Sequence, residues 1–82
     1  MTGDRFEAGW EGLWLVIEEI GHGFQAFVYD PPKTEVVHSV SRLRLDYAKL
    51  AVVEHAISMR FGLQSDLKPQ VIADMLDWKK MT

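Results

Sequence analysis

Hydrophobic residues alternate with polar residues in the first half of the chain and recur every three to four residues in the second half. Three stretches of the first half, 12–20, 24–30 and 35–40, are rich in aromatic and β-branched residues and have the pattern typical of strands. Pro31 and Pro32 separate the second stretch from the third, because proline is excluded from strand interiors. The pattern therefore predicts three strands, with the first two joined by a very short connection.

The glycines around His22 predict that this connection is a tight hairpin turn, because glycine tolerates the positive φ angles of such turns. The register that follows places four residues on one face: Trp14, Val16, Phe27 and Tyr29. The opposite face receives Leu13, Leu15, Ile17, Ala26 and Val28. A shift of one residue would bring Asp30 onto the aliphatic face, so the register is well determined. We interpret His22 as a turn residue.

Two helices are predicted in the second half, over 46–61 and 65–80, with Gly62 ending the first and Pro69 in the first turn of the second. The first helix carries two apolar stripes. The larger consists of Leu50, Val53, Ile57 and Phe61. The smaller consists of Ala48, Val52, Ala56 and Met59. A surface helix needs one apolar stripe, so two indicate a helix covered on both sides. We expect the sheet to cover the larger stripe and another helix, of this or a second chain, the smaller.

The expected fold class is α+β, with a three-stranded antiparallel sheet followed by two helices in the order β-β-β-α-α. Residues 1–11 are polar and glycine-bearing, and we expect a loose N-terminal lead there. Residues 12–82 form a single α+β domain in this prediction. The chain of 82 residues, 48% hydrophobic and 26% charged, is suited to one small folded domain.

The composition also limits the possible functions of the protein and its cellular location. The net charge of −3 disfavours broad binding to a phosphate backbone. The absence of cysteine excludes disulfides and thiolate metal sites and fits a reducing compartment. The first residues lack the pattern of a signal peptide, and no apolar run is long enough to span a membrane. These features together predict a cytoplasmic protein that does not associate with membranes.

The sequence contains no catalytic motif that we recognise. Its three histidines are scattered, its serines lack the context of an activated nucleophile, and no glycine-rich phosphate loop is present. We therefore assign no catalytic residue, no metal ligand and no cofactor, and we favour a non-enzymatic function. The alternative is a small enzyme or ligand binder that uses His22 or His38. It requires a concave site in which a histidine meets a carboxylate.

The aromatic face of the predicted hairpin is the candidate binding surface. If both helices cover the aliphatic face, Trp14, Val16, Phe27 and Tyr29 form an exposed cluster, and such clusters are typical of contacts with a protein partner or a second copy in a homodimer. The competing interpretation is that Trp10 or Trp78 folds over the cluster. A second alternative is a nucleic-acid binder that uses Arg42, Arg44 and Lys49, which requires these three cations to converge on one face.

The stretch "WLVIEEIGHGFQAFVYDPP", a short strand, and "LDYAKLAVVEHAI" together resemble the N-terminal module of HicB-like antitoxins over about residues 13–61. The proline-containing loop "YDPPKT" and the alanines of the helix contribute to the likeness. The resemblance implies a non-catalytic protein-binding module that often dimerises and whose partner is a small ribonuclease toxin. After Gly62 no separate DNA-binding domain is evident, so operator binding is not expected.

Overall fold

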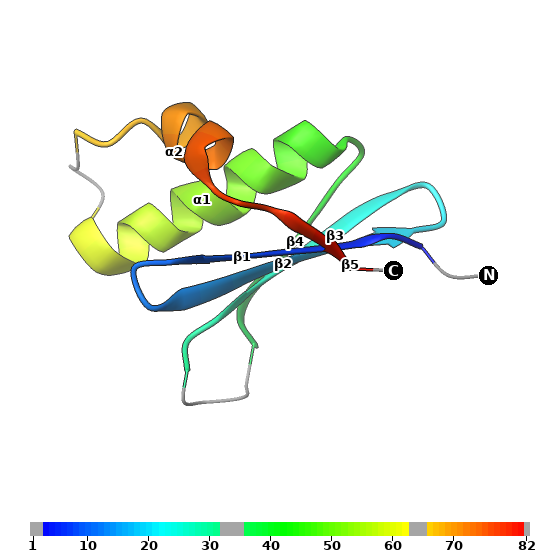
Figure 1. Cartoon of the computed structure of the whole chain (residues 1–82), viewed down its shortest axis with the longest axis horizontal. Coiled ribbons are helices and arrows are strands. Elements are labelled where there is room, and N and C mark those ends of the chain that lie inside the picture. Colours follow the sequence, from blue (N-terminus) through cyan, green and yellow to red (C-terminus); the bar gives the residue numbers. More distant parts are fainter. Residues whose placement is uncertain (1–2, 32–35, 63–65, 82) are drawn as a thin grey trace.

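The protein folds into a five-stranded antiparallel sheet with two helices on one of its faces (Figure 1). The computed structural model describes residues 3–31, 36–62 and 66–81. The strands are β1 (Arg5–Trp10), β2 (Leu13–Ile20), β3 (Gly23–Tyr29), β4 (Val36–Arg42) and β5 (Lys79–Met81). The helices are α1 (Leu45–Phe61) and α2 (Pro69–Met75). The strand order in the sheet is β4-β3-β2-β1-β5, so β4 and β5 form its two edges.

The hairpin predicted between the first two sequence strands is confirmed as β2 and β3. Trp14 pairs with Tyr29, Val16 with Phe27, and Ile20 with Gly23, so that Gly21 and His22 form a two-residue loop. Gly21 has a φ of 31°, in the region that disfavours side chains. The alternation of apolar residues therefore determined the register correctly.

The expectation of a three-stranded sheet in a β-β-β-α-α order is wrong, and so is that of a loose lead over residues 1–11. β1 lies within that lead, and every residue of β1 pairs with a residue of β2. The two strands are joined by a two-residue turn in which both Glu11 (φ 49°) and Gly12 (φ 76°) have positive φ, as in a type I′ turn. This turn matches the twist of the sheet and brings the start of the chain back beside β2.

The C-terminal segment is the second difference, because the predicted helix over 65–80 is only the seven residues of α2. Leu76 is extended (φ −67°, ψ 143°), which ends the helix. The indole N–H of Trp78 then donates a hydrogen bond of 3.0 Å to the carbonyl oxygen of Ala73, one of the free acceptors at the helix end. Residues 79–81 continue as β5 and pair with β1.

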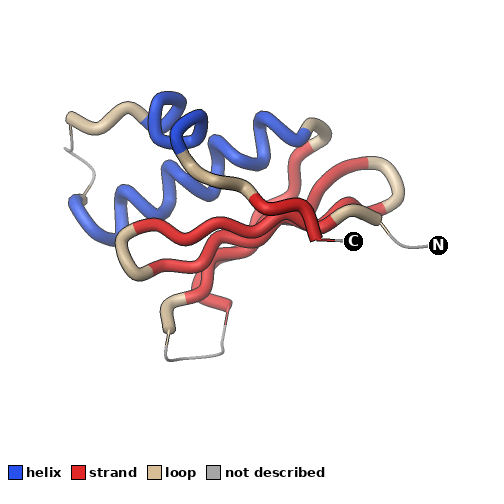
Figure 2. The backbone as a smooth tube through the Cα atoms, viewed as in Figure 1, coloured by secondary structure: helices blue, strands red, loops and turns tan. Residues whose placement is uncertain are grey.

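The core lies between the sheet and α1, which packs on β2, β3 and β4 and is itself covered by α2 (Figure 2). His55 of α1 stacks on His38 of β4, whereas Lys49 reaches Phe6 of β1. The side of α1 that lies between His55 and Lys49 carries Ala48, Val52 and Ala56, all fully buried. The smaller stripe thus faces the sheet, contrary to our expectation, because small residues on α1 leave room for the large side chains of β2.

Candidate functional site

The face of the sheet opposite the helices, here called the open face, carries the candidate binding residues. The strand pairings place residues of all five strands on it, in rows that run across the strands. One row contains Gly9, Trp14 and Tyr29. The next contains Lys79, Glu7, Val16, Phe27 and Ser39. The third contains Met81, Arg5, Glu18, Gln25 and Ser41. Both helices lie on the other side of the strands, so neither covers this face (Figure 1).

An apolar patch occupies the first two rows at the level of β2 and β3. The rings of Trp14 and Tyr29 have centroids 5.8 Å apart, and those of Phe27 and Tyr29 are 6.4 Å apart. Val16 is 0% exposed because its neighbours on the same face enclose it, whereas Trp14 is 42% exposed. The structure therefore brings together all four residues that the sequence singled out, and we call them the aromatic patch.

Neither of the other two tryptophans folds over the aromatic patch. Trp10 lies on the helix side of the sheet, where its ring centroid is 5.8 Å from that of Phe61 in α1. Trp78 also lies on the helix side, with its indole N–H bonded to Ala73 and its ring below the ammonium group of Lys49. The coverage that we considered from the sequence is therefore absent among the described residues.

On the β1 side, the aromatic patch is flanked by an ion-pair network. The Arg5 guanidinium binds Glu7 at 2.6 Å and Glu18 at 2.7 Å. The hydrogen bond to Glu7 and the charges of both carboxylates raise the pKa of Arg5, against the opposing effect of burial. Sequence reasoning missed Arg5 and Glu7 because they were placed in the loose lead.

On the β4 side, hydrogen bonds between neutral side chains flank the patch. The amide nitrogen of Gln25 donates to the hydroxyl of Ser39 at 2.6 Å, and the hydroxyl of Ser41 donates to the amide oxygen of Gln25 at 2.8 Å. The polar groups on both flanks thus already satisfy one another. Burying them beneath a partner costs less than burying polar groups that water alone satisfies.

The histidines do not form a catalytic site with the residues that the structure describes. His22 is exposed in the β2–β3 turn, beside a shallow hollow of about 170 Å³ that no carboxylate lines. His38 of β4 instead stacks on His55 of α1, with ring centroids 3.7 Å apart and an interplanar angle of 9°. Neither arrangement provides the pair of histidine and carboxylate that the enzyme alternative requires.

Burial, and secondarily the positive charge that His38 can carry, lower the pKa of His55. Since the folded state binds this proton more weakly than the unfolded state, stability is full above the ordinary histidine pKa of about 6.5. It is lost as the pH falls through that value towards the lower folded pKa. We expect the denaturation midpoint to decrease between pH 8 and pH 5, and to decrease less in a His55→Gln variant. Equal decreases in both proteins would contradict this linkage.

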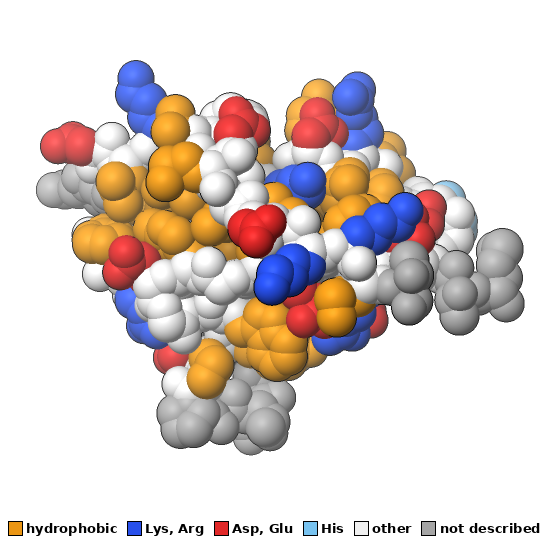
Figure 3. Space-filling model, in the orientation of Figure 1, with side chains coloured by type: hydrophobic (Ala, Val, Ile, Leu, Met, Phe, Trp, Pro, Cys, Tyr) orange, Lys and Arg blue, Asp and Glu red, His pale blue; other side chains and the backbone are white. Residues whose placement is uncertain are grey.

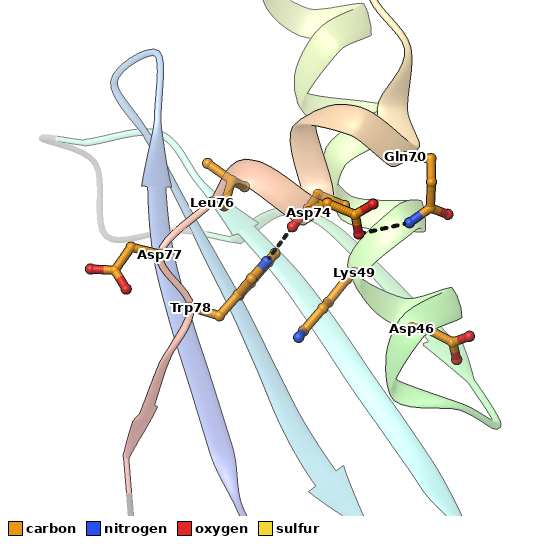
Figure 4. Close-up of a pocket in the computed structure, with 8 residues that line it drawn as sticks. Asp46, Lys49, Gln70, Asp74, Leu76, Asp77 and Trp78 are labelled. Carbon is orange, nitrogen blue, oxygen red and sulfur yellow. Dashed lines mark hydrogen bonds between the residues drawn. The ribbon is translucent and has the colours of Figure 1, made fainter.

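A pocket of about 390 Å³ between α1 and the C-terminal segment contains Lys49 and Trp78 (Figure 4). The Lys49 ammonium lies 5.5 Å from the centroid of the Trp78 ring and 5.8 Å from that of Phe6. Such cation–π contacts stabilise a partly buried lysine without a carboxylate. Asp77 points away from the Lys49 side chain in this view. We interpret the pocket as the junction that fastens the C-terminal segment to α1.

The nucleic-acid alternative requires Arg42, Arg44 and Lys49 to share one surface. Arg42 donates to the backbone oxygen of Ser41 at 2.8 Å, and Arg44 pairs with Asp46 at 3.2 Å. Lys49 is directed towards Phe6, on the side of α1 away from β4. Each of the three cations is therefore held by a different local contact, and the arrangement offers no continuous track for phosphates.

A second apolar surface lies between the C-terminal end of α1 and α2, where hydrophobic side chains gather around a groove of about 450 Å³ (Figure 3). It is lined mainly by apolar residues: Trp10, Phe61, Leu67, Val71, Ile72 and Met75. Residues 63–65, which join the two helices, lie outside the described residues. The groove therefore carries no functional assignment.

Within the described ranges, no group of three or more potential ligands is placed to hold a metal ion. No helix in those ranges is long and apolar enough to cross a membrane. Comparison with known proteins gave no match to a family model, to a curated protein or to a solved structure. The open face and its aromatic patch are thus the basis for a functional proposal.

Proposed function

We propose that this protein is a non-catalytic protein-interaction module whose aromatic patch binds another protein chain. The observation that carries the proposal is the arrangement of the open face. A cluster of aromatic side chains around Val16 is left uncovered by the helices and is flanked by polar side chains that are already paired with one another. An apolar centre within a polar rim is the usual composition of a protein interface.

The charges of the open face indicate the chemistry of the partner. Among the described residues, the cations Arg5 and Lys79 are balanced by the carboxylates Glu7 and Glu18, so the face is neutral as a whole. The partner surface that fits best is accordingly apolar at its centre and carries little net charge. Aromatic residues near the centre of an interface usually contribute most of its binding energy.

The test is simultaneous replacement of Trp14, Phe27 and Tyr29 by serine. Truncating one central aromatic residue commonly costs about 2 kcal/mol of binding energy or more, so we expect the triple variant to bind at least about 100-fold more weakly. Binding is measured by cross-linking in an extract of the native host, with a photoreactive benzoylphenylalanine at position 29. The partner identified in this way is then titrated with both purified proteins, and sedimentation records any self-association.

The matched control is Val71→Ser/Met75→Ser, which removes exposed apolar side chains from α2 on the other side of the molecule. This control should retain the partner. The proposal fails if the folded triple variant retains every partner of the wild type and self-associates to the same extent as the wild type. If the triple variant loses only self-association, the partner is a second copy and the surface is still correctly assigned.

A more specific form of the proposal rests on the resemblance of residues 13–61 to the N-terminal module of HicB-like antitoxins. It makes the partner a small toxin-like protein and places the interaction in the cytoplasm, in agreement with the absence of cysteine. The alternatives of an enzyme using His22 or His38, or of a nucleic-acid binder using Arg42, Arg44 and Lys49, lack a comparable arrangement of side chains.

A further inference from the structure

The two edges of the sheet differ in how they are protected from pairing with another strand. Natural proteins protect edge strands by making them short, by placing charged residues or proline in them, by β-bulges, or by covering them. β5 has only three residues, and two of them are Lys79 and Lys80. β4 is seven residues long, contains no proline, and carries a single charge, that of Arg42 at its end. The β5 edge is thus protected along its whole length, whereas the β4 edge, among the described residues, has only the register shift beside Val28 and Tyr29 and the terminal Arg42 as protection, and residues 38–41 have neither.

We propose that β4 pairs with β4 of a second copy of this chain, in antiparallel orientation, to form a continuous ten-stranded sheet. An exposed edge offers a row of unpaired backbone N–H and C=O groups that another strand satisfies. This contact lies at the sheet edge, next to the polar flank of the aromatic patch, and does not depend on the function proposed for the patch. It leaves the open faces of both copies available to partners.

The register follows from the regular part of β4. The ladder between β3 and β4 shifts beside Val28 and Tyr29, so the uninterrupted part of β4 is residues 38–42. Full overlap of two such segments centres the twofold axis on Val40. Ser39 of one copy then faces Ser41 of the other, twice, on the open face, where paired hydroxyl groups can share hydrogen bonds.

On the helix side of the same pairing, Val40 faces Val40 of the second copy, and His38 faces Arg42. Val40 is only partly buried in the single chain, so the pairing removes apolar surface from water. No two carboxylates and no two permanent cations are brought opposite each other. The segment is therefore compatible with a copy of itself, as a twofold interface requires.

The register can be tested with three double variants of the exposed residues Ser39 and Ser41. The first, with lysine at both positions, and the second, with glutamate at both, place like charges opposite each other at two sites of the proposed dimer. The third, Ser39→Lys/Ser41→Glu, instead places opposite charges together. All three remove the same hydrogen bonds to Gln25, so each is a matched control for the others.

We expect wild-type protein to dimerise reversibly in sedimentation experiments, and the backbone amides of β4 to exchange more slowly as protein concentration rises. The double-lysine and double-glutamate variants should dimerise more weakly, by up to about 30-fold, from two repulsive cross-strand pairs. The opposite-charge variant, Ser39→Lys/Ser41→Glu, should dimerise at least as well as the wild type. So should an equal mixture of the double-lysine and double-glutamate variants.

Three results would overturn the proposal. The first is a wild type that stays monomeric at all concentrations, without concentration-dependent protection of β4. The second is equal dimerisation of all variants. The third is failure of both the mixture and the opposite-charge variant to dimerise. A dimer that survives in the two like-charge variants but is lost on replacing Trp14, Phe27 and Tyr29 by serine would place self-association on the aromatic patch instead.

Discussion

Replacing Val53 by aspartate is expected to unfold the protein. Val53 lies in the middle of α1 and is 0% exposed. A carboxylate there has no cation within the core to pair with, and burial of an unpaired charge costs several kcal/mol. At roughly 0.05–0.15 kcal/mol per residue, the whole stability of a chain of this length is about 4–12 kcal/mol. The substitution therefore removes most or all of it.

The measurement is thermal and urea unfolding followed by circular dichroism, with Tyr47→Asp as the matched control. Tyr47 lies in the same helix but is exposed, so aspartate there should change the unfolding free energy only slightly. Ile57→Asp should behave like Val53→Asp, because Ile57 is also buried in the core. A cooperative transition with an unchanged midpoint in either core variant would show that this side of α1 does not belong to the core.

The centre of the fold was predictable from the sequence because its signals are local and agree with one another. In β2 and β3, the alternation of apolar residues and the glycines around His22 both determine the same register. That register placed the four residues of the aromatic patch on one face. The face itself could be identified as uncovered only once both helices were known to lie on the other side.

The two outer strands were missed for different physical reasons. β1 contains the alternating residues Phe6, Ala8 and Trp10, but Gly9 interrupts the β propensity of the strand. The signal that identifies it is the pair Glu11 and Gly12, a two-residue turn of a less usual composition than Asn-Gly or Asp-Gly. Recognising this turn would also have placed Arg5 and Glu7 beside the aromatic patch.

β5 has no comparable signal in the sequence. Its three residues follow a helical pattern without a break of glycine or proline, and its pairing with β1 depends on contacts distant in the chain. The orientation of α1, whose smaller stripe faces the sheet, also depends on contacts distant in the chain. Which stripe lies there depends on the volume that β2 already fills, and a helical projection contains no information about that volume.

Replacing Gly21 and Gly23 together by valine is expected to destabilise the β2–β3 hairpin strongly. Gly21 has a positive φ, and holding a β-branched residue there costs roughly 1–3 kcal/mol. At Gly23, a Cβ atom would lie 2.9 Å from the backbone oxygen of Arg42, and overpacking of this kind typically costs about 1–3 kcal/mol. The combined loss of about 2–6 kcal/mol is a large part of the total stability.

The control is His22→Ala, in the same two-residue loop. The imidazole is exposed and hydrogen-bonds no other described residue, so the unfolding free energy should change by no more than about 0.5 kcal/mol. Urea unfolding measures both variants, and partner binding is assayed in parallel. If His22→Ala keeps its fold but loses an activity, a bound metal or the partner, the loop is a functional site rather than a turn. If the double valine variant unfolds at the wild-type midpoint, the glycines are not required by the turn geometry.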